Sequence, residues 1–264
     1  GAGVGIHVAD LDDGTWLFDQ NGGARLNPAS NHKIVTAVAA VELLGPDYRF
    51  HTRLVRDGDA LVLVGDGDPS LQIQGLHALA TRALASGALA GVRRIVVDGS
   101  AFSAERHGPG YDEPPGPGPS YLAPSGALSL GFNTVEVTTA RHGAEVSVEV
   151  APASEHVQVV NLARAGRGRA LEATSTCEGG ATRITVTGAA QARPTVLRRR
   201  ICDPARFTGE AFAGIVAELG GPRLAVEVGI ASAHAREVAS LTSPPLVEIL
   251  ASALKYSNNF TSEQ

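Results

Sequence analysis

The chain has 264 residues and 27.1 kDa, and its 44% apolar content with a mean hydropathy of +0.05 is typical of a soluble globular protein. The net charge is -5, and the 5% of aromatic residues are not interleaved with the basic ones, which argues against nucleic-acid binding. No run approaches the roughly 18 apolar residues of a membrane span, and no signal-peptide pattern opens the chain. Because the sequence contains no methionine, we expect a mature or trimmed product.

The predicted elements begin with a β-hairpin, in which residues 4–10 alternate between apolar and polar and residues 15–18 return after a turn. A helix follows, with Asn27 as its predicted N-cap and Pro28 at its first position. Apolar residues then recur at helical spacing until Gly45 and the proline after it end the helix.

Residues 50–71 predict two strands joined by a turn at 57–59. Residues 76–89 have a helical pattern and residues 92–98 a strand pattern. This order of strand, helix and strand indicates a small α/β unit.

The second half of the chain is richer in predicted strands. Residues 133–202 alternate as short β-strands separated by glycine-containing turns. We expect a helix at 208–219, a strand at 224–230 and the start of another helix at 245–253. Together with the first half, this pattern predicts an α+β fold.

Metal and cofactor sites are not indicated. Cys177 and Cys202 fit no metal-ligand spacing, and they are either one disulfide, which needs an oxidising compartment, or two buried thiols. The eight histidines form no His-x-x-x-His pair that would indicate zinc. Asp66 and Asp68 lack a third oxygen donor at the spacing of a metal loop, so we interpret them as turn formers. We therefore expect neither a metal nor a cofactor.

Lysine is scarce, with two residues against 20 arginines. Lys33 lies three residues after Ser30, and Lys255 lies two residues before Ser257. Arginine stays protonated in proteins, whereas a partly desolvated lysine can lose its proton and act as a base. The lysine distribution therefore predicts a serine nucleophile that is activated by lysine.

The surroundings of each lysine support this hypothesis. Ser30 and Lys33 are predicted on one face of a helix N-terminus, where free N–H groups and the helix dipole stabilise developing negative charge. The alternative is a first-turn serine beside a solvated lysine. Ser257 can relay a proton and Asn259 can orient both the lysine and a substrate amide, although Ser-Asn-Asn is also an ordinary turn or helix cap.

The pair of motifs Ser-x-x-Lys and Ser-x-Asn resembles the penicillin-recognising serine enzymes. More narrowly, the chain resembles the class C low-molecular-mass penicillin-binding proteins, the D-alanyl-D-alanine carboxypeptidase/endopeptidases of peptidase family S13. The resemblance runs through the whole chain and is more specific than either motif. It is carried by residues 27–30, 43–50, 65–71, 127–133 and 243–250.

This resemblance implies a transpeptidase-like (β-lactamase-like) catalytic domain with two nested inserted domains, one β-rich and one small α/β. By position, residues 1–50 and 241–264 belong to the catalytic domain, 51–71 and 146–240 to the first insert, and 72–145 to the nested second insert. The third family motif, Lys-Thr-Gly, is absent because both lysines are already assigned. We therefore expect the catalytic domain to be incomplete and the sequence to be a portion of a longer protein.

The resemblance also implies roles for single residues. Ser30 is expected to be the acylated nucleophile, with its backbone N–H in the oxyanion hole, and Lys33 its general base. Ser257 is expected to shuttle a proton, Asn259 to bind the substrate amide and the lysine, and Lys255 to support substrate binding.

A loop of the nested insert is expected to reach the active site and to recognise the free end of the peptide side chain. Tyr121 matches an aromatic residue of that loop. An acidic residue is expected shortly before it, and the nearest candidates are Asp112 and Glu113.

The function that the resemblance implies is a serine D-Ala-D-Ala carboxypeptidase/endopeptidase in the periplasm or another extracytoplasmic, cell-wall compartment. Its partners would be peptidoglycan stem peptides and the β-lactams that acylate it, with no cofactor; the oligomeric state is left open. One alternative is a catalytically silent peptidoglycan-binding or scaffold protein, which the missing third motif favours. The other is a β-lactamase or esterase on the same scaffold, against which the large insert argues.

Overall fold

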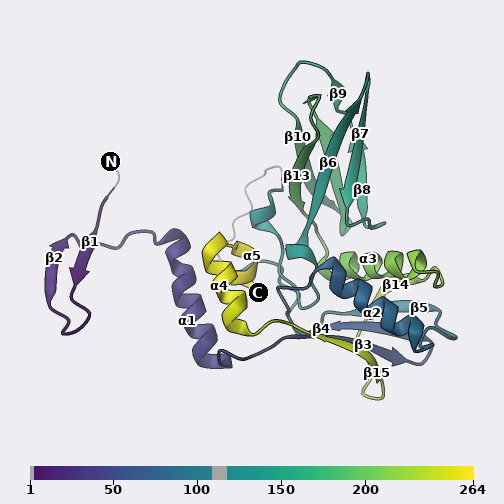
Figure 1. Ribbon diagram of the computed structural model, residues 1–264, viewed down its shortest axis with the longest axis horizontal. Coiled ribbons are helices and arrows are strands. Elements are labelled where there is room, and N and C mark those ends of the chain that lie inside the picture. Colours follow the sequence, from purple (N-terminus) through teal and green to yellow (C-terminus); the bar gives the residue numbers. More distant parts are fainter. Residues whose placement is uncertain (1–2, 109–117) are drawn as a thin grey trace.

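The computed structural model describes residues 3–108 and 118–264. Within these ranges the strands form five sheets, and the helices are distributed between two regions of the molecule. Figure 1 shows a five-stranded sheet with two covering helices, a β-rich unit beside it, and a group of helices that leads to an outlying hairpin. The fold is therefore a mixed α+β fold, as predicted.

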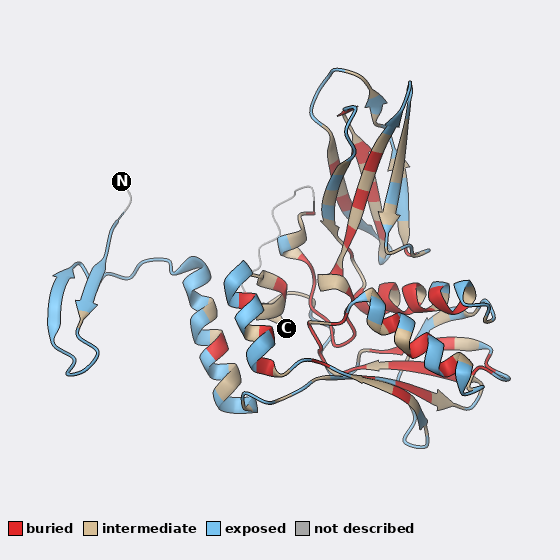
Figure 2. Cartoon of the chain, viewed as in Figure 1, coloured by how far each residue is buried: buried red, intermediate tan, exposed pale blue. Residues whose placement is uncertain are grey.

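The predicted hairpin is confirmed. Strands β1 (Ile6–Ala9) and β2 (Trp16–Gln20) pair in antiparallel order. The turn between them is held by Asp13, whose carboxylate accepts the backbone N–H of Thr15 at 2.8 Å. The hairpin contributes little to the core, because Trp16 is 71% exposed and both strands are largely exposed in Figure 2.

The helix after the hairpin begins later than predicted. A short 3-10 helix η1 (Ala29–Asn31) comes first, and the α-helix α1 (His32–Leu44) continues from it. Asn27 does not cap α1; its side chain instead accepts the backbone N–H of Ala29 at 2.9 Å and stabilises the entry to η1. The predicted end is confirmed, since Gly45 follows Leu44 with a φ of 88°.

The central sheet is mixed and has the order β14-β5-β4-β3-β15. Strand β4 pairs in parallel with β5 and antiparallel with β3, and β15 adds an antiparallel edge. Its strands are β3 (His51–Asp57), β4 (Ala60–Gly65), β5 (Arg94–Asp98), β14 (Ala225–Val228) and β15 (Arg236–Thr242). The sequence analysis did not predict β15.

Two helices cover one face of this sheet (Figures 1 and 2), and the main core lies between them and the strands. They are α2 (Ile73–Ala85) and α3 (Pro204–Glu218), each beginning three or four residues before the predicted start. Because side chains alternate along a strand, Leu61 and Leu63 of β4 join this core, while Val62 between them lies on the opposite face.

The predicted run of short strands forms the β-rich unit. One sheet contains β6 (Thr134–His142), β7 (Glu145–Ala151) and β13 (Thr195–Arg200); a second contains β8 (Val157–Asn161), β10 (Glu172–Glu178) and β11 (Ala181–Thr187); and a small third pairs β9 (Arg164–Ala165) with β12 (Ala189–Ala190). Cys177 and Cys202 form a disulfide, which decides between the two alternatives left open by the sequence.

Strand pairing links the ranges of the two expected inserts. Strand β5 lies inside the range 72–145, yet it pairs with β4, which was expected in the first insert. Strand β6 of the same range pairs with β13. Hydrogen bonds between strands therefore cross both boundaries of that range, and the expected division into inserts stays a prediction.

The end of the chain returns to α1. Helix α4 (Leu246–Tyr256) contacts α1, and the short α5 (Asn259–Glu263) follows it. In Figure 1 the two lie between α1 and the central sheet. None of the helices in the described ranges is long and apolar enough to cross a membrane.

Candidate active site

The side chain of Lys33 joins the two predicted motifs. Its Nζ lies 3.0 Å from Ser30 Oγ and 2.8 Å from Asn259 Oδ1. Lys33 is half-buried, whereas Ser30 is exposed. The structure thus brings together the predicted nucleophile, its predicted base and one residue of the second motif.

The local fold explains why Ser30 and Lys33 meet. Ser30 lies in η1 and Lys33 in the first turn of α1, and residues three apart along a helix lie on the same face. The backbone N–H groups of Asn31 and His32 are bonded to carbonyls of Pro28, Ala29 and Ser30, so these groups are not free as the sequence predicted. The dipole of α1 still favours negative charge near its start, which suits a serine that attacks a carbonyl group.

Asn259 reaches Lys33 because the chain turns sharply after α4. Ser257 ends α4 in the left-handed conformation, with a φ of 52°, and the backbone N–H of Asn258 bonds to the carbonyl of Ala253 at 2.9 Å. The side chain of Asn258 then caps α5 by accepting the N–H of Thr261. Asn259 is therefore the first residue of α5, and its side chain faces α1.

Two predicted site residues are not bonded to this cluster. Among the described residues, the hydroxyl of Ser257 makes no hydrogen bond, and the exposed Lys255 places its Nζ 5.4 Å from the ring centre of Tyr256. Their expected roles stay predictions.

Tyr121 contacts the cluster with its backbone. It belongs to the 3-10 helix η2 (Ser120–Leu122), and its carbonyl accepts a hydrogen bond from Asn259 Nδ2 at 3.3 Å. Its side chain is 61% exposed. Asp112, the predicted acidic partner, lies outside the described residues, as does Glu113.

Gln264 is a residue of the site region that the sequence analysis missed. Its side chain accepts the N–H of Gly126 at 2.9 Å and donates to the carbonyls of Gly126 and Gly67 at 3.0 and 3.1 Å. These bonds attach the segment that ends α5 to two loops of the rest of the molecule. Its partners are all backbone groups, so no motif in the sequence could have indicated them.

A second missed residue supports the loop that carries Tyr121. Asn133 is fully buried, and its side chain bonds to the carbonyl of Pro124, the hydroxyl of Ser129 and the N–H of Leu130. The neighbouring Phe132 packs edge-on against Phe260 of α5 at 6.0 Å between ring centres. Buried polar groups that are fully paired hold a loop in one conformation.

The two aspartates that resembled a metal loop have other partners. Asp66 accepts the backbone N–H of His51, and Asp68 accepts both the N–H and the hydroxyl of Ser70. Within residues 3–108 and 118–264, no three histidine, cysteine or acidic side chains are grouped as metal ligands. The bonds of Asp68 are those of a turn-forming aspartate, as predicted.

Comparison with known proteins identifies the family. The pattern of the D-Ala-D-Ala carboxypeptidase 3 (S13) family matches residues 1–264. The chain belongs to this family. A D-alanyl-D-alanine carboxypeptidase of Actinomadura sp. (strain R39) is 33% identical to this S13 chain over 98% of its length. The match spans 52% of that relative, so the chain covers about half the length of the relative.

Other similar proteins are more distant. The D-alanyl-D-alanine carboxypeptidase DacB of Haemophilus influenzae is 30% identical over 123 positions, covering 42% of this chain and 25% of that protein. The crystal structure of penicillin binding protein 4 (dacB) from Haemophilus influenzae aligns with a TM-score of 0.76 at 21% identity, over 97% of this chain and 60% of that one. A second structure of that protein, complexed with a β-lactam, aligns with a TM-score of 0.70 at 19% identity, over 97% and 58%. These alignments confirm the predicted penicillin-binding fold.

Proposed function

We propose that the protein is a serine D-Ala-D-Ala carboxypeptidase/endopeptidase that acts on peptidoglycan stem peptides through an acyl-enzyme on Ser30. One observation carries this proposal: Lys33 Nζ lies within hydrogen-bonding distance of both Ser30 Oγ and Asn259 Oδ1. The S13 family of the chain and the carboxypeptidase names of its relatives support the same activity. The structure of a relative with a β-lactam supports acylation of this protein by such compounds.

The proposed reaction begins with Lys33 as a neutral amine. The amine donates a hydrogen bond to Asn259 Oδ1, which turns its lone pair toward the hydroxyl of Ser30. Ser30 Oγ attacks the carbonyl carbon of the terminal D-Ala-D-Ala bond while its proton passes to Lys33 Nζ. The C–N bond then breaks, the departing D-alanine nitrogen takes up the proton that Lys33 received, and an ester remains on Ser30 while Lys33 returns to a neutral amine.

Hydrolysis completes the proposed cycle. A water molecule gives a proton to Lys33 and attacks the ester carbonyl, and Ser30 regains its proton when the ester bond breaks. Ser257 is the αL residue of the turn that positions Asn259, and we propose that its hydroxyl relays the proton from Lys33 to the departing amine once substrate is bound. Asn259 Nδ2, now bonded to the carbonyl of Tyr121, is available as a donor to the substrate amide.

The disulfide between Cys177 and Cys202 supports an extracytoplasmic location, since disulfides persist in oxidising compartments. Peptidoglycan lies outside the cytoplasmic membrane, so this location matches the proposed substrate. We therefore propose a location at the cell wall, in the periplasm or an equivalent compartment.

The test is intact-mass spectrometry of the full-length protein after incubation with a fluorescent penicillin. We expect one adduct on the wild type and none on Ser30→Ala, while Ser252→Ala, at an exposed serine of α4, labels like the wild type. Lys33→Arg should also fail to react, because a guanidinium does not give up its proton. Release of D-alanine from a stem pentapeptide then tests the substrate. A folded protein that forms no adduct would refute the proposal and favour the scaffold alternative.

A further inference from the structure

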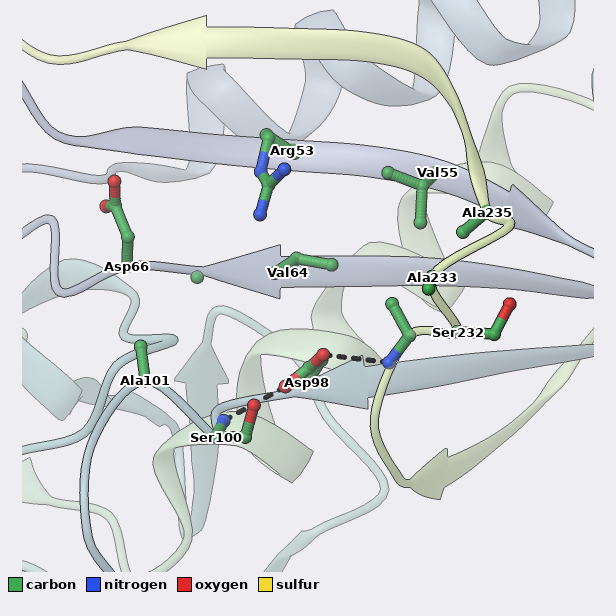
Figure 3. A pocket seen from close by; sticks show the side chains of 12 residues that line it. Arg53, Val55, Val64, Asp66, Asp98, Ser100, Ala101, Ser232, Ala233 and Ala235 are labelled. Carbon is green, nitrogen blue, oxygen red and sulfur yellow. Dashed lines mark hydrogen bonds between the residues drawn. The ribbon is translucent and has the colours of Figure 1, made fainter.

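The face of the central sheet that α2 and α3 leave uncovered contains a cavity of about 410 Å³ (Figure 3). This volume lies within the range of roughly 300–1,000 Å³ that small-molecule sites occupy. None of the residues that line it belongs to the Ser30 cluster. The cavity is therefore a separate candidate site, to which the proposed function assigns no role.

Strand alternation determines which side chains line the cavity. Because every second residue of a strand lies on the same face, Arg53 and Val55 of β3 share this face with Val64 of β4, and Asp66 continues the series just after β4. The aliphatic side chains form a small apolar floor, and the two charged residues lie toward one end. Figure 3 shows the guanidinium of Arg53 extending from β3 toward β4, between Asp66 and Val64 in this view.

The charges of the cavity are available to a ligand. Among the described residues, the side chain of Arg53 makes no hydrogen bond or ion pair, although Asp66 lies on the same face. Asp66 accepts only the backbone N–H of His51, so its oxygens keep lone pairs for a second donor. Burial raises the pKa of Asp66, and a cation bound beside it would offset that burial.

The wall of the cavity is held in place by two carboxylates. The segment before β15 passes over the open face, where Asp98 accepts the N–H of Ala231 at 2.8 Å. Asp57 accepts both the N–H and the hydroxyl of Ser232, at 2.8 and 2.9 Å. Asp98 is itself only 4% exposed and also bonds the N–H of Ser100. Because these bonds already fix the wall, a ligand would not lose binding free energy to ordering it.

We propose that this cavity binds a short aliphatic peptide with free ends, whose carboxylate pairs with Arg53 and whose ammonium group pairs with Asp66. The guanidinium offers two parallel donors that match a carboxylate. Arg53 is paired in register with Val64, two residues before Asp66, and two residues of a strand span about 7 Å. A dipeptide in extended form has the same reach, and Val64, which lies opposite Arg53, offers an apolar contact at its carboxylate end.

The experiment uses the full-length protein after treatment with penicillin, with its valine methyl groups labelled for NMR. The probe is D-alanyl-D-alanine, and the methyl resonances of Val55 and Val64 report occupation of the cavity. We expect saturable shifts in the wild type. Arg53→Gln should weaken binding about tenfold or more, since it removes a charged bidentate partner. Arg93→Gln, at an exposed arginine outside the cavity, should bind like the wild type.

Two modified probes test the two ends separately. The dipeptide amide lacks the carboxylate and should bind the wild type as weakly as the dipeptide binds Arg53→Gln. The N-acetyl dipeptide lacks the ammonium group and should match the loss caused by Asp66→Asn. Absence of saturable shifts in the wild type would overturn the proposal. Equal affinity of Arg53→Gln and wild type, or of the blocked and free probes, would overturn it as well.

Failure of the proposed function gives a different signal. Intact mass of the same sample shows whether Ser30 carries the penicillin adduct. If it does not, the comparison of wild type with Arg53→Gln at the Val64 methyl groups still tests the cavity. The NMR comparison therefore tests the cavity proposal independently of the proposed function.

Discussion

Replacing Asn259 by alanine tests whether its bond to Lys33 serves the reaction. The substitution removes the 2.8 Å contact from Lys33 Nζ to Asn259 Oδ1 and leaves the 3.0 Å contact to Ser30 in place. Lys33 then has one partner of the two and can rotate away from the hydroxyl. We expect the serine to remain in position but to lose an oriented base.

The magnitude follows from the kind of bond that is lost. Lys33 becomes charged as it takes up the Ser30 proton during attack, and a hydrogen bond that involves a charged group contributes about 1.5–3 kcal/mol. Each 1.4 kcal/mol is about a factor of ten in rate. Acylation of Asn259→Ala by penicillin should therefore be roughly 10- to 100-fold slower. Thermal stability should change little, because both side chains are only half-buried.

The assay is the second-order rate of acylation by a fluorescent penicillin, followed with the full-length protein. Ser252→Ala is the control, because this serine is exposed on α4 and lies outside the Lys33 cluster. We expect that control to keep both its stability and its acylation rate close to wild type. If Asn259→Ala acylates as fast as wild type, the orienting role of Asn259 is wrong.

Three further predictions concern stability. Asn133→Ala should lower the free energy of unfolding by about 3 kcal/mol, because it leaves buried backbone groups unpaired; a loss below about 1 kcal/mol in urea unfolding would contradict this. Replacing Cys177 and Cys202 by serine should cost about 3 kcal/mol, since the disulfide closes a separation of 25 residues; reductant should destabilise the wild type equally but not this variant. Burial lowers the pKa of His156 from 6.5, so the unfolded chain binds its proton more tightly, and stability should fall as the pH drops below about 6.5. His156→Gln should flatten this decline when the unfolding temperature is measured against pH. If the decline is as steep in the variant as in the wild type, another group causes it.

The elements that the sequence predicted well are those with strong local signals. The hairpin, the end of α1 at Gly45 and the strands of the β-rich unit follow from alternation and turn residues. Strand β15 was missed because residues 236–242 alternate poorly and lie at a sheet edge. Its pairing partner β3 is far away in sequence, and local patterns do not record such a partner.

The same distinction applies to the candidate site. The contact of Ser30 with Lys33 follows from a spacing of three residues in one helix. The contact of Lys33 with Asn259 spans 226 residues, and it was indicated by the hydrogen-bonding groups of Asn259 and by the family resemblance, not by a local structural pattern. The expected division into inserts stays a prediction, because the pairs β4–β5 and β6–β13 link the expected ranges but do not define where one domain ends and the next begins.

The position of Asn259 depends on contacts that lie outside the catalytic motifs. Helix α5 has only five residues, too few to be stable alone, so its placement must come from tertiary contacts. Phe260 supplies an apolar anchor that is 3% exposed, and Gln264 supplies three hydrogen bonds to loops of the rest of the molecule. The orientation of Lys33 is thus set by side chains that never approach the reacting atoms. The pair Ser30 and Lys33 is a local property of one helix, whereas its activation is a property of how the distant segments pack together.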